Sequence, residues 1–299
     1  MAFGRRRFLK IAAAAAGTVA VGRAKAEPAS DGSSLGVLMD ASVCIGCRKC
    51  EWACNRQNHL TDRPQTAYED RSVCLDPRRP DANAFTVVNR YPDKPGSDKG
   101  YAVKIQCLHC LRPACVSACI VGALRKHPLG PVHYDEWKCI GCRYCMVACP
   151  FEIPAYEYNR ALEPRVRKCF FCFDRVVGEG RVPACVEICP NEALTFGRRE
   201  ALIDAAYIRM TAAPERYKQH LYGEHEAGGT SWMYLAPADL ASAGLPELGE
   251  KPIPEATERI QHGVFRDFVP PLALYGLLGL VLHNTRGDAG DDRPEGPVA

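Results

Sequence analysis

The sequence predicts an α+β fold in which short helices and short strands surround groups of cysteines. Three observations lead to this expectation. The chain of 299 residues contains 17 cysteines, 25 glycines and 23 prolines, a composition rich in loops and in sulfur. Sixteen of the cysteines form four groups of four. A loop–helix–strand pattern also repeats, after Cys119 and after Cys189.

The overall composition excludes several classes of protein. With 47% hydrophobic and 24% charged residues, the chain is neither a polytopic membrane protein nor a disordered one. Residues 1–26 hold six basic residues and no acid, so the rest of the chain has 32 basic against 35 acidic residues. Nucleic-acid binding calls for a strongly basic domain. We therefore expect no nucleic-acid partner.

Residues 1–26 have the features of an export signal. Three consecutive arginines precede an apolar stretch over 11–21 and an A-x-A cleavage motif at 24–26. Paired arginines followed by Phe-Leu-Lys are typical of the twin-arginine route. That route exports folded proteins, which suits a chain whose cofactors are inserted in the cytoplasm. An uncleaved N-terminal anchor is the alternative interpretation.

The four cysteine groups share a spacing. In each group the first two cysteines are separated by two residues, and the last two by three residues. The first and third groups have the complete C-x2-C-x2-C-x3-C run of bacterial ferredoxins. The groups are Cys44, Cys47, Cys50 and Cys54; Cys107, Cys110, Cys115 and Cys119; Cys139, Cys142, Cys145 and Cys149; and Cys169, Cys172, Cys185 and Cys189.

This spacing has a physical reason. Gaps of two residues let a tight loop wrap three thiolates around one face of a cubane, with backbone N–H groups free to point at its sulfides. The gap of three residues begins a helical turn that carries the fourth cysteine about 6 Å away, toward a second cluster. Two clusters that exchange fourth ligands in this way lie on the order of 10 Å apart, which suits electron tunnelling.

Zinc and disulfides are the alternative uses of so many cysteines. Zinc needs four ligands per site and gives no reason for a regular third and fourth cysteine. Disulfides form in exported proteins, yet oxidative folding outside the cell fits poorly with export in a folded state. We therefore expect four [4Fe–4S] clusters and no open iron for a substrate. A zinc- or disulfide-stabilised interaction protein is the distant alternative.

Catalytic motifs are missing from the sequence. It has no dinucleotide-binding glycine motif after a strand, no phosphate loop and no nucleophile elbow. We expect an electron carrier that is not itself an enzyme and has no small-molecule substrate of its own.

Other segments predict short regular elements. Strands are expected over 132–134 and 194–196, and helical character is expected over 198–210. The alternating pattern over 231–235 predicts a half-buried strand, and its aromatic residues are alternatively a docking strip for a partner.

The complete layout resembles a family, the four-cluster iron–sulfur electron-transfer subunits of periplasm-facing respiratory oxidoreductases. The likeness is greatest to the hydrogenase-2 operon type, covers nearly the whole chain and is strongest over 100–195. Asn55 and Ile120 depart from it, because proline often follows the fourth cysteine, but both affect a turn and no ligand. The residues that carry the resemblance are 5–10, 133–135, 140–150, 220–224, 228–230 and 260–262.

The resemblance implies a fold and a ligand assignment. The fold is two tandem, interleaved bacterial-type ferredoxin modules, each with two [4Fe–4S] clusters. The first group pairs with the fourth and the second with the third, whereas spacing alone leaves this pairing open. The implied ligand sets are Cys44, Cys47, Cys50 and Cys189; Cys54, Cys169, Cys172 and Cys185; Cys107, Cys110, Cys115 and Cys149; and Cys119, Cys139, Cys142 and Cys145.

The expected domain organisation follows from these segments. The ferredoxin-like domain over 37–200 has an outer module (37–60 and 165–197), an inner module (100–160) and an insertion (61–99). It is followed by an extension over 201–263 that is expected to dock a partner, a C-terminal anchor over 264–283 and a polar tail over 284–299.

The anchor rests on the apolar run 268–282. As a helix this run rises about 22 Å, less than the roughly 30 Å hydrocarbon core. A helix docked on a partner is therefore the alternative to a membrane anchor.

The resemblance also implies partners and a location. A signal together with an anchor is most similar to the subunits that serve a periplasmic [NiFe] hydrogenase. The expected partners are its small and large subunits and an integral-membrane quinone-reactive subunit, at the periplasmic face of the inner membrane. The alternatives are a molybdopterin oxidoreductase, of the formate dehydrogenase or DMSO/polysulfide reductase type, and a multihaem nitrite reductase.

Several residues near the ligands remain open to two interpretations. Cys74 lies outside the four groups and is expected to be an ordinary small residue, with an extra ligand or a thiol toward a partner as the alternatives. His109 lies between two ligands and could tune a potential or replace a ligand. Basic residues beside the ligands either raise reduction potentials or are ordinary surface charges. They are Arg48, Lys49, Arg112, Lys138, Arg143 and Lys168.

Overall fold

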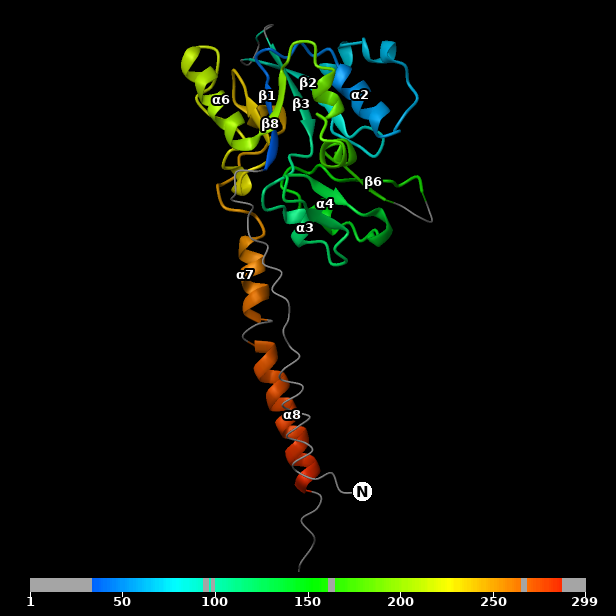
Figure 1. Ribbon diagram of the computed structural model, residues 1–299, viewed down its shortest axis with the longest axis vertical. Helices are drawn as coiled ribbons and strands as arrows, with labels where there is room; N and C mark the ends of the chain where they lie inside the picture. Colours follow the sequence, from blue (N-terminus) through cyan, green and yellow to red (C-terminus); the bar gives the residue numbers. More distant parts are fainter. Residues whose placement is uncertain (1–33, 94–96, 98–99, 161–164, 265–267, 287–299) are drawn as a thin grey trace, which may run out of the picture.

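In the computed structural model the described residues form a head of helices and strands, and the C-terminal helices extend away from it (Figure 1). The structure describes residues 34–93, 97, 100–160, 165–264 and 268–286. The expected export signal over 1–26 and all but the start of the polar tail lie outside the described residues.

The head mixes short strands with short helices, which confirms the α+β class. The strands are β1 (Leu35–Asp40), β2 (Thr86–Pro92), β3 (Gly100–Gln106), β4 (Leu124–Lys126), β5 (Val132–Tyr134), β6 (Ala155–Tyr156), β7 (Val166–Arg167), β8 (Leu194–Arg198) and β9 (Trp232–Leu235). The α-helices of the described residues are α2 (Lys49–Gln57), α3 (Ala114–Ser117), α4 (Tyr144–Ala148), α5 (Ala184–Glu187), α6 (Arg199–Ala212), α7 (Glu255–Gly263) and α8 (Val269–Arg286).

Within the described ranges, the strands form one three-stranded sheet and three two-stranded ribbons. In the sheet, β1 lies between an antiparallel β8 and a parallel β9. The ribbons pair β2 with β3, β4 with β5 and β6 with β7, all antiparallel. The strands predicted at 132–134 and 194–196 are confirmed as β5 and as part of β8, and the helix predicted at 198–210 is confirmed as α6.

Two pairs of helices pack together in the head. Helix α2 packs against α5, and α3 packs against α4. Strands β1 and β8 accompany the first helix pair, whereas β4 and β5 accompany the second. The chain therefore begins one unit with β1 and α2, builds a second unit from α3 to α4, and returns to the first unit with α5 and β8 (Figure 1).

Strand β9 is buried on both faces, so the expectation of a half-buried strand is wrong. Trp232 and Tyr234 belong to the main hydrophobic core, whereas Met233 and Leu235 belong to a second core under α6. Successive residues of a strand point to opposite faces, so a strand between two cores is apolar throughout. The two aromatic side chains are at most 1% exposed, so the docking strip considered for them is wrong as well.

The segment 61–99 contributes to the core although the sequence marks it as an insertion. Its strand β2 buries Val87 and Val88 and pairs along its full length with β3. Strand β3 in turn leads directly into the second cysteine group, so this ribbon positions Cys107.

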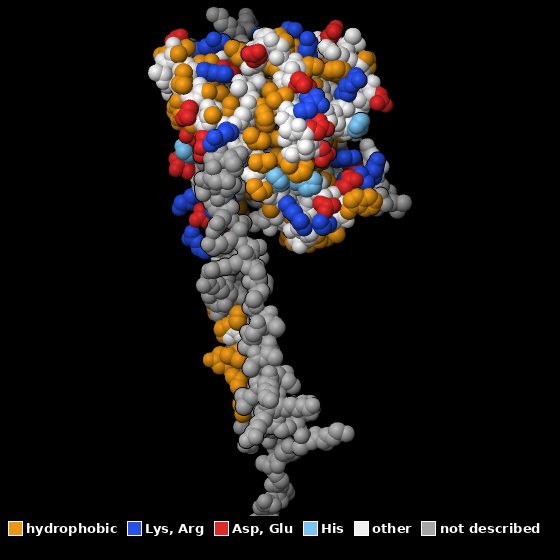
Figure 2. Space-filling model, viewed as in Figure 1, with side chains coloured by type: hydrophobic (Ala, Val, Ile, Leu, Met, Phe, Trp, Pro, Cys, Tyr) orange, Lys and Arg blue, Asp and Glu red, His pale blue; other side chains and the backbone are white. Residues whose placement is uncertain are grey.

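The C-terminal helices carry exposed apolar side chains. On α8 the exposed fractions include 64% at Leu272 and 71% at Tyr275, and Figure 2 shows hydrophobic side chains along this helix. Among the residues that the structure describes, no helix combines the length and the apolar character that crossing a membrane requires. The expected membrane anchor over 264–283 is therefore not supported. Its apolar run is short and gives way to His283 and Asn284 before α8 ends.

Candidate metal centres

The first and third cysteine groups have the same loop conformation. In both, a left-handed glycine precedes the second cysteine, with φ of 65° at Gly46 and 69° at Gly141. A left-handed arginine follows that cysteine, with φ of 61° at Arg48 and 62° at Arg143. Helices α2 and α4 begin at the next residue, so the third and fourth cysteines of each group lie on the first turns of a helix or just after it. The predicted ferredoxin-type loop is thus present twice.

The second and fourth groups also resemble each other. His109 and Phe171 take left-handed conformations, with φ of 51° and 59°, immediately before the second cysteine of each group. Pro113 and Pro183 stand at the N-caps of α3 and α5, which carry the third cysteines. These two groups therefore complete the two helix pairs, α3 with α4 and α5 with α2.

The thiols converge in sets that draw on different groups. Cys44, Cys47 and Cys50 line a common cavity with Cys189. The same mixing appears in the charge interactions between thiols elsewhere in the described chain. Cys54 interacts with Cys169, Cys172 and Cys185; Cys110 with Cys107, Cys115 and Cys149; and Cys145 with Cys119, Cys139 and Cys142.

Burial dominates the electrostatics of these thiols. It raises the pKa of Cys44 to about 11 and that of Cys169 to about 12, and neighbouring thiols add to both shifts. Backbone N–H groups act in the opposite direction at Cys149, where Phe151, Glu152 and Ile153 donate toward the sulfur. Because metals bind the thiolate, cluster assembly at these sites must release protons.

The donor chemistry of the site fits [4Fe–4S] clusters. Thiol sulfur is the donor that such clusters use, and backbone N–H groups directed at the sulfur are the hydrogen bonds that set their potentials. No group of three or more His, Cys, Asp or Glu side chains in the described ranges is arranged to hold a single metal ion.

A buried ion-pair network supports the first loop. Glu51 Oε2 accepts from Arg48 Nη2 at 2.9 Å, and Glu51 Oε1 accepts from Arg78 Nη2 at 2.7 Å and from the Val88 N–H at 2.6 Å. The network joins the first cysteine loop to β2. Arg48 is therefore neither a free surface charge nor free to move.

The six basic residues beside the ligands differ in their surroundings. Lys168 is 1% exposed, and its Nζ donates to the Val132 carbonyl at 2.8 Å. By contrast, the Lys138 side chain is 45% exposed and pairs with Asp135, and the Arg112 side chain is 37% exposed.

Two further lysines were missed by sequence reasoning, which considered only residues next to ligands. Lys104 is buried on β3, and Lys126 on β4 lies near the second group. A charged residue within the otherwise apolar run of β3 was the available signal for Lys104.

His109 is fully buried between the second and fourth groups. Its Nδ1 accepts a hydrogen bond from the Val132 N–H at 2.9 Å, and its ring packs edge-on against Phe171 at 5.0 Å between centroids. Burial, reinforced by Lys168 and Lys126, holds its pKa well below the usual value, so the ring is neutral. Nothing in this arrangement requires His109 to replace a cysteine.

Cys74 lies against the first cysteine loop. It is 3% exposed, and its Sγ is 4.0 Å from the Gly46 carbonyl oxygen. Burial raises the pKa of its thiol, with further effects of Arg78 and Glu51. That Cys74 is no ligand stays a prediction.

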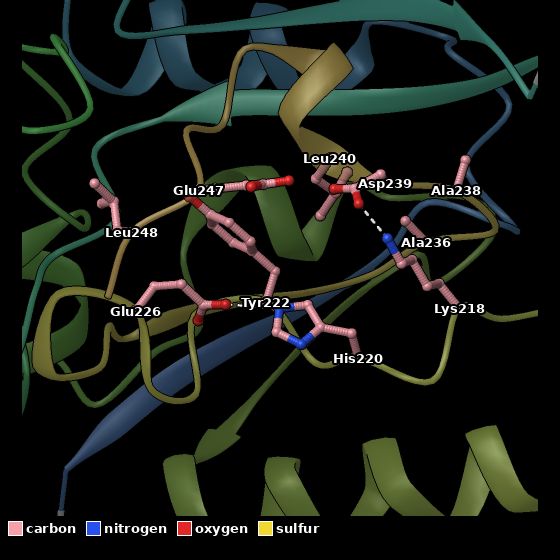
Figure 3. A pocket seen from close by; sticks show the side chains of 10 residues that line it. All are labelled: Lys218, His220, Tyr222, Glu226, Ala236, Ala238, Asp239, Leu240, Glu247 and Leu248. Atoms are coloured by element: carbon pink, nitrogen blue, oxygen red, sulfur yellow. Dashed lines mark hydrogen bonds and ion pairs between the residues drawn. The ribbon is translucent and has the colours of Figure 1, made fainter. Parts of the chain in front are cut away.

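A separate pocket lies in the extension, between the loop after α6 and the segment after β9 (Figure 3). Its polar side chains are mostly paired with one another. His220 Nε2 lies 2.6 Å from Glu226 Oε1, Lys218 pairs with Asp239, and the Tyr222 hydroxyl donates to the Pro246 carbonyl. These pairings resemble a structural network more than a reaction centre.

Comparisons with known proteins agree with this geometry. Residues 99–199 match the model of the 4Fe-4S dicluster domain family. The chain is 37% identical to the hydrogenase-2 operon protein HybA of Escherichia coli O157:H7 over 327 residues, covering 96% of this chain and 98% of the relative.

Two other relatives are similar. A protein of Nitratidesulfovibrio vulgaris is 50% identical over 261 residues, with 85% of this chain and 70% of the relative covered. The formate dehydrogenase-O iron-sulfur subunit of Escherichia coli K12 is 35% identical over 247 residues, with coverages of 80% and 77%.

Fold and site thus define a ferredoxin-type iron–sulfur protein that binds more than one [4Fe–4S] cluster. The chain belongs to the family of iron–sulfur electron-transfer subunits that includes HybA and the formate dehydrogenase iron–sulfur subunits.

Proposed function

We propose that the chain carries four [4Fe–4S] clusters and passes electrons between a periplasmic [NiFe] hydrogenase and an integral-membrane quinone-reactive subunit. Each cluster supplies a one-electron couple when bound. The residues of the chain hold the clusters in sequence, bury them and set their surroundings. The proposed ligands are the four cysteine sets implied by the resemblance, and no catalytic residue is assigned.

The observation that carries this proposal is the continuity of the four cysteine sets. Cys50 of the first set interacts with Cys185 of the second, and Cys169 of the second set interacts with Cys107 of the third. Cys115 of the third set interacts with Cys145 of the fourth. A series without a break supports a linear path for electrons through the protein.

The far end of this series is open to a partner. Cys142 is exposed, whereas the cysteines of the set at the other end are all half-buried, namely Cys44, Cys47, Cys50 and Cys189. Large apolar side chains are also exposed around the third cysteine group, and a surface of this kind supports docking of a redox partner. They are Ile120, Trp137, Ile140, Tyr144, Val147 and Tyr158.

The choice of a hydrogenase rests on the relatives. The similarity to HybA extends over 96% of this chain, whereas that to the formate dehydrogenase-O subunit extends over 80%. The same relay in a formate dehydrogenase complex is the second candidate, favoured by the 35% identity to that subunit. Periplasmic location after twin-arginine export is proposed from residues 1–26, and a signal on this chain itself favours the hydrogenase type.

Basic and acidic side chains are interspersed on the face of the head shown in Figure 2. This distribution gives no support to a nucleic-acid partner, which would require a continuous basic surface.

Metal analysis of the native complex tests the proposal. A tagged copy of the chain is purified anaerobically from its own membranes, with its partners. We expect nickel together with about sixteen irons from this chain and those of the hydrogenase. Molybdenum without nickel would indicate a partner of the formate dehydrogenase type. A colourless complex would contradict the presence of iron–sulfur clusters and so overturn the proposal.

A further inference from the structure

Lys104 places a positive charge in the interior of the head. It lies on β3, is 2% exposed, and its Nζ donates to Gln106 Oε1 at 2.9 Å. The ammonium also lies over the ring of Trp232, 4.5 Å from its centroid. In the part of the chain that the structure describes, no ion pair joins Lys104 to a carboxylate. A buried charge without an opposite charge is costly, so its presence requires an explanation.

The groups that would compensate this charge are cysteines, which bind a cluster as thiolates. Those whose charges act on the ammonium are Cys185, Cys50, Cys169 and Cys54. Cys50 belongs to the first ligand set and the other three to the second. Lys104 also lines the cavity that contains Cys44, Cys47 and Cys189. The ammonium therefore lies between the two ligand sets of the outer unit.

The cavity places Lys104 beside a complete ligand set. Lys104 lines it together with Cys44, Cys47, Cys50 and Cys189, the four cysteines of the first set. A cluster held by these thiolates would put negative charge beside the ammonium.

The position of Lys104 is fixed on two sides. Gln106 Nε2 donates to the Tyr234 hydroxyl at 2.7 Å, and this hydroxyl donates to the Lys104 carbonyl at 3.1 Å. A cation that is held in place does not have to rearrange when charge arrives nearby. Reduction adds one negative charge to a cluster, and a fixed cation at low dielectric stabilises that reduced form.

We propose that the Lys104 ammonium is a fixed charge that raises the reduction potentials of the two outer clusters, those of Cys44, Cys47, Cys50 and Cys189 and of Cys54, Cys169, Cys172 and Cys185. This inference rests on the ligand sets proposed above. It assigns to Lys104 the setting of the potential, with no part in binding iron.

Lys126 offers a matched comparison within the same chain. It is a partly buried lysine, and its Nζ donates to the His109 carbonyl at 3.0 Å. The thiols that act on it are Cys110, Cys107 and Cys115, which belong to the inner unit. Removal of this charge should therefore affect an inner cluster and leave the outer pair unchanged. Lys138, exposed beside Cys139, is the control for a lysine in solvent.

The test is a potentiometric titration of the purified complex followed by EPR, with iron determined in each sample. Lys104→Met removes the charge, Lys104→Gln removes it but keeps a donor toward Gln106, and Lys104→Arg retains it. At a fixed potential, both neutral variants should shift the reduced-to-oxidised ratio of the outer clusters about tenfold toward oxidised, about 59 mV for a one-electron couple. Lys104→Arg and Lys138→Met should leave the outer potentials near those of the wild type.

Several results would overturn the inference. One is an iron-replete Lys104→Met protein with unchanged outer potentials, and another is an Arg variant shifted as far as the Met variant. Equal shifts in the reduction potentials of the inner and outer clusters would contradict the placement of the Lys104 ammonium between the two outer ligand sets. Loss of iron from both neutral variants would assign the lysine to folding instead. Failure of the proposed function is seen separately, as missing nickel or a deficit of iron in the wild-type complex.

Discussion

Glu51 is the residue whose loss should weaken the first cluster loop most. Its side chain is 4% exposed and connects Arg48, itself 9% exposed, with Arg78 and the Val88 N–H. Removal of one partner from a buried ion pair costs about 3–5 kcal/mol, because the remaining charge stays buried and unpaired. In Glu51→Gln the amide oxygen still accepts one hydrogen bond, so we expect a loss near the lower end, about 3 kcal/mol.

This loss is measurable as a change in the melting of the cluster-loaded protein. For a chain of this size, about 3 kcal/mol corresponds to a fall of about 6–12 °C in the apparent midpoint at a fixed scan rate. The visible absorbance of the clusters reports the transition, and chelator-accessible iron reports damage to the first loop. Glu200→Gln is the control, because Arg198 and Glu200 form an ion pair with both side chains more than 60% exposed, worth at most about 1 kcal/mol. A Glu51→Gln midpoint within about 2 °C of the wild type would refute the reasoning.

Three further substitutions test other parts of the structure. Gly141→Ala should lower the midpoint more than Gly122→Ala, because both are left-handed but only the first would place its Cβ 2.8 Å from the Tyr156 hydroxyl; equal effects in melting experiments would contradict the contact. Cys74→Ala should leave the iron content unchanged, and a loss of iron on elemental analysis would make Cys74 a ligand. Met233→Ala empties a site that is 0% exposed and should cost about 2–5 kcal/mol in denaturant unfolding; a loss below about 1 kcal/mol would show that the core beneath α6 collapses around the gap.

The local chemistry of the cysteine loops could be predicted from the sequence. Spacing alone identifies the loops, because three thiolates around one cubane face require short gaps and a turn. The structure makes this turn with the left-handed Gly46 and Gly141. The strand at 132–134 was also readable, because it belongs to the loop–helix–strand repeat. The helix at 198–210 was readable from its helical character.

What could not be predicted depends on contacts between distant segments. Strand β9 is apolar on both faces because one face meets the main core and the other meets α6, which alternation within five residues does not reveal. The segment 61–99 looks polar, yet it supplies β2, which pairs with β3. Lys104 could not be ranked above the lysines next to ligands, because its proximity to Cys185 arises only on folding. The apolar run 268–282 was too short for its length alone to distinguish a membrane anchor from a helix docked on a partner.

The most direct test of the central claim follows electrons through the intact complex. Hydrogen is added anaerobically to the purified complex while the visible cluster absorbance is recorded, and a quinone analogue is then supplied. We predict that hydrogen bleaches the clusters and the quinone analogue restores their colour. A complex without this chain should still reduce an artificial dye with hydrogen but no longer reduce the quinone analogue. Bleaching by formate but not by hydrogen, or quinone reduction that persists without the chain, would contradict the account.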